Sequence, residues 1–281
     1  MAEPSSPSSA LYGGDQNRRI TVRDLQAAKD RHERWPMLTA YDAMTAAIFD
    51  TAGVPVLLVG DSAANVIYGY DSTIPVTMDE LVPLVAAVTR GTHRALVVAD
   101  MPFGSYQASP AHALEQAARF LKEGGAHAVK LEGGQRVVPQ VDALVGAGIP
   151  VMGHLGLTPQ SVNALGGYRV QGRGGAGELL LREAKALEAA GAFAVVLEVV
   201  PAELARRVTE SVSIPTIGIG AGNGCDAQVN VWQDLVGLTP GPGPKFVRRY
   251  ADVRSVITDA VAAWSNDVVS GAYPDEERSY S

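Results

Sequence analysis

The stretch that decides the fold is residues 52–62, Ala-Gly-Val-Pro-Val-Leu-Leu-Val-Gly-Asp-Ser. Its four consecutive apolar residues, 56–59, are typical of a strand buried on both faces, as parallel strands are when helices cover them. Gly53 is placed to end a preceding helix, and Asp61 stands where the strand ends. The stretch therefore predicts one unit of a repeat in which a helix, a glycine and a buried strand follow one another.

The same pattern returns along the chain, around Gly148 and Gly191. Ser109 followed by Pro110 is typical of a helix start, and Gly124-Gly125 of a helix end. Strands are expected over residues 37–40, 54–60, 95–100, 126–132, 149–153, 192–198, 214–219 and, with a weaker pattern, 229–236. Eight alternating strands and helices predict an α/β fold of the (β/α)8 TIM-barrel type, with a parallel eight-stranded barrel.

The length of 281 residues suits a single barrel, because such domains commonly reach about 250 residues. We expect a catalytic barrel over residues 21–265, beginning with an N-terminal helix. Residues 1–20 are rich in Ser, Pro and Gly and predict a flexible extension, and the polar residues 266–281 predict a mobile C-terminal tail.

Charge and cysteine content exclude several classes of partner. The chain has 30 acidic and 23 basic residues, a net charge of -7, which is the wrong sign for nucleic acid or anionic lipid. No apolar run approaches the roughly 18 residues of a membrane span, and the start lacks the pattern of a secretory signal. Cys225 is the single cysteine, so no internal disulfide forms. We expect a cytoplasmic protein without a nucleic-acid or membrane partner.

A glycine-rich segment at residues 217–224 suggests an alternative, an open sheet that binds a dinucleotide. The glycine fingerprint of that fold fails, because Asn223 and Cys225 stand where the two possible registers require glycine. We interpret the segment as a turn after a late barrel strand, with main-chain amides that could meet an anionic group.

Polar residues follow five consecutive apolar strands: Asp61, Asp100, Glu132, His154 and Glu198. The active site of a (β/α)8 barrel lies at the carboxyl ends of its strands. An acidic residue at one strand end often only caps the next helix, but five such positions in succession indicate a shared site.

The first three of these residues predict a metal site. Neighbouring strands lie about 4.8 Å apart, so the carboxylates of Asp61, Asp100 and Glu132 should converge and repel one another. Either one takes up a proton or a cation neutralises them. Ligands that are all oxygen suit a hard ion, Mg²⁺ before Ca²⁺ or Zn²⁺, and Mg²⁺ leaves positions for a bidentate 2-oxo acid.

The other polar residues have more than one interpretation. Lys130 precedes Glu132 by two residues, so both should face into the barrel. The lysine is either an ion-pair partner of a carboxylate or the cation that holds the substrate carboxylate or a developing enolate; a Schiff base is less favoured beside a metal. Glu198, near the metal but not on it, is the candidate base. His154 is either a wall residue or a substrate contact.

Several motifs resemble those of the 3-methyl-2-oxobutanoate (ketopantoate) hydroxymethyltransferase family, over roughly residues 35–250. They are Gly60-Asp61-Ser62, Tyr70-Asp71-Ser72-Thr73, Ala99-Asp100-Met101-Pro102-Phe103, Lys130-Leu131-Glu132-Gly133-Gly134, the run Gly153-His154-Leu155-Gly156-Leu157-Thr158-Pro159-Gln160-Ser161, and Gly166-Gly167-Tyr168-Arg169.

The resemblance implies transfer of a hydroxymethyl group from 5,10-methylenetetrahydrofolate to 3-methyl-2-oxobutanoate, through a magnesium-stabilised enolate, to give 2-dehydropantoate for pantothenate biosynthesis. It implies that Asp61 and Asp100 are metal ligands, with Glu132 a further ligand through water. It also implies that Ser62 and Lys130 contact the oxo acid, as the metal ligands Asp61 and Asp100 do through the ion, and that Glu198 is the base. A homo-oligomer, a decamer, is expected in the same way.

Two other functions stay open. One is another magnesium-enolate barrel, a carbon–carbon lyase or mutase of the isocitrate lyase type, although the lysine-cysteine-glycine-histidine loop of that class is absent. The other is a catalytically silent barrel that binds a metabolite. The long segment 156–173 is either a mobile cover over the site or an ordered packing loop.

Overall fold

The computed structural model describes residues 10–13 and 18–280. The predicted extension over residues 1–20 therefore lies largely outside the described residues, although Leu11 and Ile20 are both buried in the hydrophobic core. The chain divides into two compact units after Val231.

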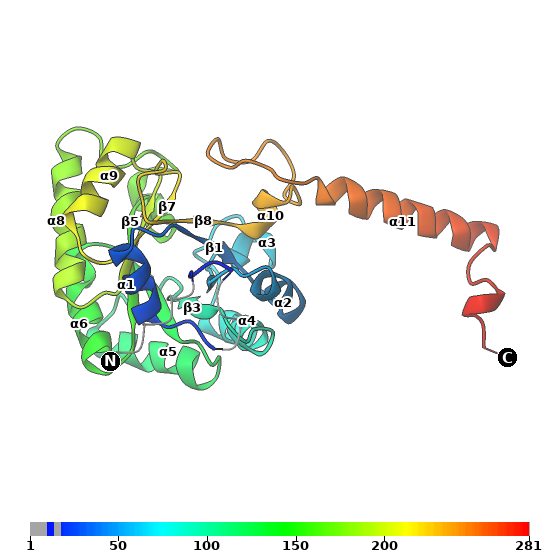
Figure 1. The fold of residues 1–281 in the computed structure, drawn as a ribbon, viewed down its shortest axis with the longest axis horizontal. Helices are drawn as coiled ribbons and strands as arrows, with labels where there is room; N and C mark the ends of the chain where they lie inside the picture. The colour runs from blue at the N-terminus through cyan, green and yellow to red at the C-terminus, as the bar shows by residue number, and fades with distance from the viewer. Residues whose placement is uncertain (1–9, 14–17, 281) are drawn as a thin grey trace, which may run out of the picture. The chain divides into compact units, whose positions relative to one another are not determined.

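The first unit is a closed barrel of eight parallel strands in chain order, in which β8 pairs with β1 (Figure 1). The strands are β1 Trp35–Thr39, β2 Val56–Val59, β3 Leu96–Asp100, β4 Ala128–Glu132, β5 Val151–Gly156, β6 Ala194–Glu198, β7 Thr216–Ile219 and β8 Ala227–Asn230. The predicted (β/α)8 barrel is confirmed.

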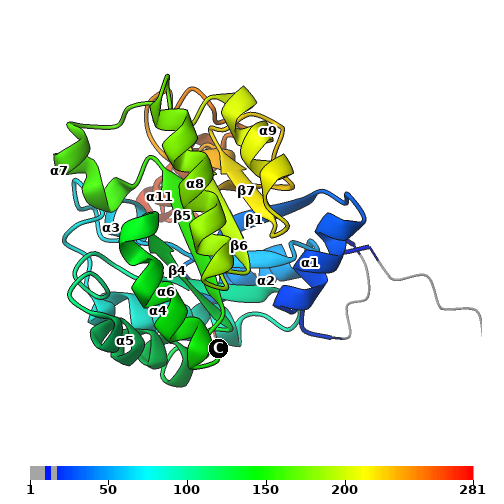
Figure 2. The same cartoon turned by 90° about the vertical axis from the view of Figure 1, so that its left-hand side faces the viewer.

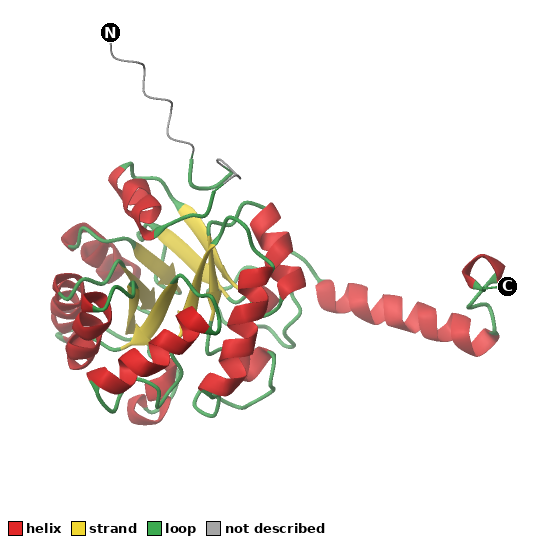
Figure 3. Cartoon of the chain, turned by 90° about the horizontal axis from the view of Figure 1, so that it is seen from below, coloured by secondary structure: helices red, strands yellow, loops and turns green. Residues whose placement is uncertain are grey.

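Helices surround the strands of this unit (Figures 2 and 3). They are α1 Val22–Asp30, α2 Ala43–Thr51, α3 Ala63–Val66, α4 Met78–Arg90, α5 Pro110–Lys122, α6 Val138–Gly146, α7 Val162–Leu165, α8 Ala176–Ala189 and α9 Ala202–Ser211, with short 3-10 turns at Gln135–Val137 and Pro159–Ser161. The strands are therefore buried between the barrel interior and a helix layer, which explains their continuous apolar runs.

The residues expected from the sequence to begin and end helices do so in the structure. The Ser109 side chain accepts a hydrogen bond from the main-chain N–H of His112 and begins α5, whose first residue is Pro110. Gly53, Gly148 and Gly191, which precede three strands, all have positive φ. Glycine adopts this left-handed conformation without the steric cost that a Cβ imposes, so these positions turn the chain from helix to strand.

The eighth strand was predicted too late in the chain. Residues 229–236 were expected to form it, but β8 covers Ala227–Asn230 and Trp232–Leu235 is the short helix α10. Pairing of Ala227 with both Trp35 of β1 and Ile217 of β7 sets the strand's start. Gln228 is exposed, so the beginning of β8 lacks the apolar run that identified the other strands.

Because side chains alternate between the two faces of a strand, the polar side chains at the strand ends point into the barrel. Leu96, Val98, Ala128, Met152 and Val196 all belong to the core cluster inside the barrel. Residues two positions further along the same strands continue on the same face. Asp100, Lys130, His154 and Glu198 therefore follow this apolar core toward the carboxyl ends, and Glu132 follows Lys130.

The second unit contains α10, the long helix α11 Val253–Ser270 and a 3-10 turn at Glu276–Arg278. Helix α11 runs across the predicted boundary at residue 265, and the predicted domain limits stay predictions. Its exposed apolar side chains are Val256, Ile257, Val261, Trp264, Val268 and Val269. Among the helices described, α11 included, none combines the length and the hydropathy that a bilayer crossing requires.

His127, just before β4, makes the stability of the protein depend on pH. Its Nδ1 accepts a hydrogen bond from the main-chain N–H of Val97 at 3.0 Å. Burial, assisted by the charge of Arg19, lowers the pKa of His127 to about 4 from 6.5. Between these two values the unfolded chain binds more protons than the folded chain, so the free energy of unfolding rises with pH. This contribution is complete above pH 6.5 and is lost as the pH falls toward 4.

We expect His127→Asn, which offers an amide oxygen to the same N–H but does not titrate, to flatten this dependence. The difference in unfolding free energy between the two proteins should change by about 1–2 kcal/mol between pH 7 and pH 4.5, allowing for solvent screening of a half-buried ring. Urea unfolding across that range measures it, with the exposed His93→Asn as the control. Parallel curves for wild type and His127→Asn would contradict the assignment.

Candidate active site

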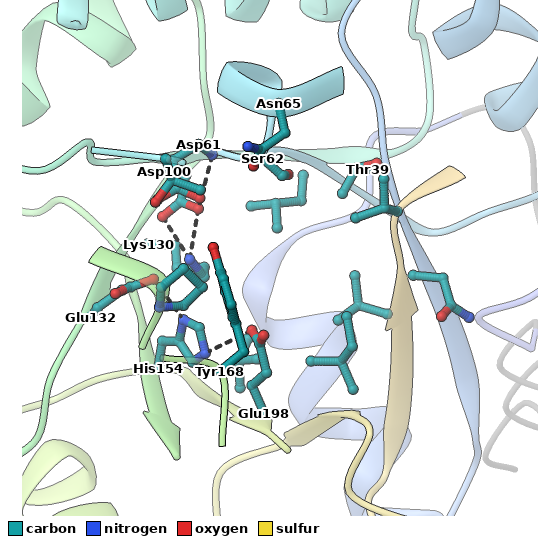
Figure 4. Close-up of a pocket in the computed structure, with 18 residues that line it drawn as sticks. Thr39, Asp61, Ser62, Asn65, Asp100, Lys130, Glu132, His154, Tyr168 and Glu198 are labelled. Atoms are coloured by element: carbon teal, nitrogen blue, oxygen red, sulfur yellow. Dashed lines mark hydrogen bonds and ion pairs between the residues drawn. The ribbon is translucent and has the colours of Figure 1, made fainter. Parts of the chain in front are cut away.

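A cavity of about 150 Å³ opens at the carboxyl ends of the barrel strands (Figure 4). All seven residues that the sequence predicted for the site line it: Asp61, Ser62, Asp100, Lys130, Glu132, His154 and Glu198. Thr39, Asn65, Thr73, Tyr168 and Asn230 complete its polar lining. This volume lies below the roughly 300–1,000 Å³ of pockets for drug-sized ligands, so the cavity suits a small ligand.

Lys130 and Asp100 form a buried ion pair on the adjacent strands β4 and β3, where they are register partners. The Lys130 Nζ lies 2.7 Å from both carboxylate oxygens of Asp100. Burial alone would lower the pKa of Lys130, but the charges of Asp100 and Glu132 outweigh it and the pKa is raised. The lysine is therefore a cation in the folded protein and is paired with Asp100, and its contact with substrate stays a prediction.

Asp61 lies on the turn between β2 and α3 and is also buried. Its main-chain N–H donates to Asp100 Oδ2 at 3.2 Å. Burial raises the pKa of the Asp61 carboxyl well above its ordinary value, and the neighbouring charges of Asp100 and Glu132 raise it further. Burial also raises the pKa of Asp100, against the opposing charge of Lys130. These carboxyls therefore crowd one another, as the sequence predicted.

His154 lies between two glutamates. Its Nδ1 is 3.4 Å from Glu132 Oε1, and its Nε2 is 3.2 Å from Glu198 Oε2. Burial and Lys130 lower the pKa of His154, but the two glutamates outweigh them and raise it to about 9. A protonated imidazole therefore connects the acidic side of the cavity to Glu198, which agrees with the interpretation of His154 as a wall residue held by polar contacts, and its contact with substrate stays a prediction.

The main chain around Glu198 is tightly constrained. Gly156, its register partner on β5, has φ +93, and a Cβ there would lie 2.3 Å from the Glu198 carbonyl oxygen. That oxygen accepts a hydrogen bond from the Leu157 N–H at 2.8 Å. Val199 has φ +48, a rare conformation for a β-branched residue that costs about 1–3 kcal/mol. The strand end is held in a strained geometry directly beside the candidate base.

Ser62 lines the cavity beside Asp61. Its Oγ lies 2.8 Å from the hydroxyl of the buried Tyr41, and this contact fixes the orientation of the serine. The Tyr41 ring is fully enclosed, and burial raises the pKa of its hydroxyl. A neutral tyrosine therefore fixes one side of the serine, whose other side faces the cavity.

Two residues that sequence reasoning left without a role belong to the site. Gln160 is buried beneath the acidic residues and bonds to Asp61 and Glu132. Tyr168 lines the cavity from the segment before α8, and burial followed by the charges of Asp61 and Glu198 raises its pKa. Both lie within the quoted motifs, but strand alternation does not extend into a loop and could not place their side chains.

The remaining lining of the cavity is aliphatic. Val196, Ile219, Val229 and Val231 come from β6, β7 and β8 or the residue that follows, and Leu58 comes from β2. In a closed barrel of eight strands, β7 and β8 lie across from β3 and β4. The cavity therefore has a charged side and an apolar side that face each other.

The donor set can be tested for its fit to a divalent cation. Within residues 10–13 and 18–280, no three His, Cys, Asp or Glu side chains are arranged so that they could hold a metal ion as they stand. Mg²⁺, however, is commonly bound by one or two carboxylates, with waters and substrate oxygens in the other positions. Two buried, mutually repelling carboxyls, Asp61 and Asp100, meet that requirement, whereas Glu132 Oε1 faces His154 Nδ1 at 3.4 Å.

Comparison with known proteins agrees with the resemblance noted in the sequence. The model of the family described as ketopantoate hydroxymethyltransferase matches residues 19–276. The chain is similar to the 3-methyl-2-oxobutanoate hydroxymethyltransferase of Frankia casuarinae, with 66% identity over 99% of this chain and 96% of the relative. It is also similar to that of Thermobifida fusca, with 65% identity over 98% of this chain and 99% of the relative.

Among solved structures, the chain resembles a phosphonopyruvate hydrolase complex with oxalate and Mg²⁺, with a TM-score of 0.60 and 12% identity over 92% of this chain and 93% of that one. A 2,3-dimethylmalate lyase of the PEP mutase/isocitrate lyase superfamily gives a TM-score of 0.54 and 16% identity over 92% of both chains. At such identities these likenesses concern the fold alone.

Proposed function

The chain belongs to the ketopantoate hydroxymethyltransferase family, and we propose that it transfers a hydroxymethyl group to 3-methyl-2-oxobutanoate to give 2-dehydropantoate. The proposed donor is 5,10-methylenetetrahydrofolate. The observation that carries the proposal is a small cavity in which a buried acidic group with Lys130 faces an aliphatic wall, with Glu198 at its edge.

The two sides of the cavity match the two ends of this oxo acid. Its carboxylate and 2-oxo group are anionic or polar and suit the side of Lys130 and Ser62. Its isopropyl group suits the aliphatic side formed by Val196, Ile219 and Val229. In this orientation C3, which carries the proton to be removed, lies between the two sides.

Asp61 and Asp100 are the residues that would hold Mg²⁺, and Glu132 would reach it through water. When bound, the ion would polarise the carbonyl of the oxo acid as a Lewis acid. Lys130 adds a fixed positive charge where negative charge develops on the substrate oxygen. Because Lys130 is already paired with Asp100, it is oriented before the substrate arrives.

Glu198 is the proposed general base. Its carboxylate lines the cavity and is held by His154 on one side. It removes the proton from C3 of the oxo acid, and the C3–H electron pair becomes the enolate. Water adds to the methylene carbon of the folate, and both bonds from that carbon to nitrogen break, so that tetrahydrofolate leaves and the carbon remains as formaldehyde. The enolate carbon then forms a bond to this carbon, whose oxygen takes up a proton to become the hydroxyl group of the product. The donor would approach through the open mouth of the cavity.

A carbon–carbon lyase or mutase is the second candidate, because the solved 2,3-dimethylmalate lyase shares the fold. The full-length sequence relatives favour the transferase. We also propose that the protein forms a homo-oligomer, which the exposed apolar residues of α11 support, since such side chains gain stability when a partner covers them.

Deuterium exchange at C3 tests the chemistry without the donor. We expect the protein to exchange the C3 proton of 3-methyl-2-oxobutanoate in heavy water when Mg²⁺ is present, and EDTA to abolish the exchange, because the carbonyl is then no longer polarised. Proton NMR of the substrate measures the rate. Addition of 5,10-methylenetetrahydrofolate should then convert the substrate to 2-dehydropantoate.

The same samples separate the candidates. A lyase or mutase would yield cleaved or rearranged oxo acids and no folate-dependent product. Exchange no faster than in buffer with Mg²⁺ alone would refute the proposed mechanism.

A further inference from the structure

Gln160 bonds to two of the acidic residues, and no sequence pattern indicated these contacts. It follows β5 in the 3-10 turn Pro159–Ser161 and is 4% exposed. Its side-chain Nε2 donates to Asp61 Oδ2 at 3.0 Å and to the Met101 carbonyl at 2.9 Å. Its main-chain N–H donates to Glu132 Oε2 at 3.0 Å. One residue therefore connects the ends of β2, β3 and β4.

The orientation of the Gln160 amide is determined by its other partners. Its Oε1 lies 2.8 Å from the hydroxyl of the buried Tyr106 and accepts a hydrogen bond from Gln107 Nε2 at 3.3 Å. If the amide were reversed, Oε1 would face Asp61 Oδ2 and the Met101 carbonyl, which are both acceptors. Tyr106 therefore holds the amide with its N–H groups toward Asp61.

This arrangement has a consequence for Asp61. Because Gln160 engages Oδ2, the other oxygen, Oδ1, is the one left for a ligand in the cavity. The Gln160 main chain also engages Glu132 Oε2, while Glu132 Oε1 lies 3.4 Å from His154 Nδ1, so both oxygens of Glu132 face a protein donor. Gln160 therefore fixes Asp61 by one oxygen, and among the described residues the other oxygen of Asp61 faces no such donor.

We propose that Gln160 is a positioning residue, which acts through Asp61 to present one carboxylate oxygen to a divalent cation and which is itself oriented by Tyr106. The inference rests on the proposed function, because it requires that the acidic group binds a metal. Groups that orient metal ligands commonly change metal affinity or activity by about 10–100-fold when they are removed.

Binding of Mn²⁺ to the metal-free protein, followed by the loss of the free-ion electron paramagnetic resonance signal, is the test. We expect Gln160→Met, which keeps the length of the side chain and loses both hydrogen-bonding groups, to weaken Mn²⁺ binding about 10–100-fold. Gln140→Met is the matched control. Gln140 is also buried and bonds to the Tyr106 carbonyl, but it bonds to no carboxylate among the described residues, so its replacement should leave the affinity within about twofold.

A second variant tests whether Tyr106 acts on metal binding by orienting the Gln160 amide. Tyr106→Phe removes the hydroxyl that orients the amide and should weaken Mn²⁺ binding in the same direction, by a smaller factor. Because the Tyr106 hydroxyl also lies 3.2 Å from the main-chain nitrogen and oxygen of Glu132, the loss in the double variant should not exceed the sum of the two single losses. In the C3 exchange assay, saturating Mg²⁺ should restore the rate of Gln160→Met, which a general loss of structure would not allow.

The outcomes separate this inference from the proposed function. If the wild-type protein neither binds Mn²⁺ nor exchanges the C3 proton, the proposed function fails. If the wild type does both and Gln160→Met or Tyr106→Phe binds Mn²⁺ with wild-type affinity, the positioning role is wrong. A loss of exchange in Gln160→Met that Mg²⁺ does not restore also overturns it. Urea unfolding of each variant shows whether it folds, and Tyr106→Phe carries the test if Gln160→Met does not.

Discussion

Glu198→Gln should reduce the rate of C3 deuterium exchange by about 10²–10⁴-fold, the usual contribution of a general base. Glutamine has the shape of glutamate but does not accept a proton at neutral pH. Because the main chain at Glu198 is fixed by Gly156 and Leu157, the substitution should leave the strand end in place. Substrate binding, measured by calorimetry, should change little, so the loss should appear in the rate.

The control is Glu203→Gln on α9, where an exposed glutamate is paired with Arg206. The Glu203→Gln protein should exchange the C3 proton of the oxo acid at the wild-type rate. Glu198→Gln also removes one of the two carboxylates that raise the pKa of His154, so that pKa should fall from about 9. Proton NMR of the imidazole follows it. A Glu198→Gln protein that exchanges C3 within about threefold of wild type would assign the base to another residue.

Lys130→Met should lower the free energy of unfolding by about 3–5 kcal/mol at neutral pH, the effect of removing one partner of a buried ion pair. Methionine fills the space of the lysine stem, but Asp100 then loses the cation that lies 2.7 Å from both of its oxygens. Asp61 and Glu132 are close enough to add their repulsion. Urea unfolding measures the change.

A double-mutant cycle identifies the cause. Asp100→Asn together with Lys130→Met should be less destabilised than the sum of the single variants, by about 1–3 kcal/mol, because the neutral amide no longer needs a cation. Lys122→Met, an exposed residue at the end of α5, is the control. If the acidic group binds a metal, Mg²⁺ should stabilise Lys130→Met more than wild type. A Lys130→Met protein as stable as wild type would contradict the buried ion pair.

Much of the site followed from strand alternation. Asp100, Lys130, Glu132 and Glu198 lie in or at the ends of strands with clear apolar runs, so their inward direction could be predicted from residue spacing. Asp61 was expected from its place directly after β2, and the structure brings it to Asp100 through its main-chain N–H. The start of β8 was missed because Ala227-Gln228 has no apolar run, and only its pairing with β1 and β7 locates it.

The sequence by itself determined the barrel, its eight strands and the rim on which the polar residues gather, because these depend on local periodicity and on glycines at helix ends. Only the tertiary structure decided which oxygen of Asp61 is free, that His154 connects Glu132 with Glu198, and that Gln160 holds three strand ends together. Those features depend on side chains from segments as far apart as Asp61 and Gln160, which meet only when the barrel closes. Periodicity predicts the direction in which a side chain points from its own strand. It does not predict which loop residue will contact that side chain.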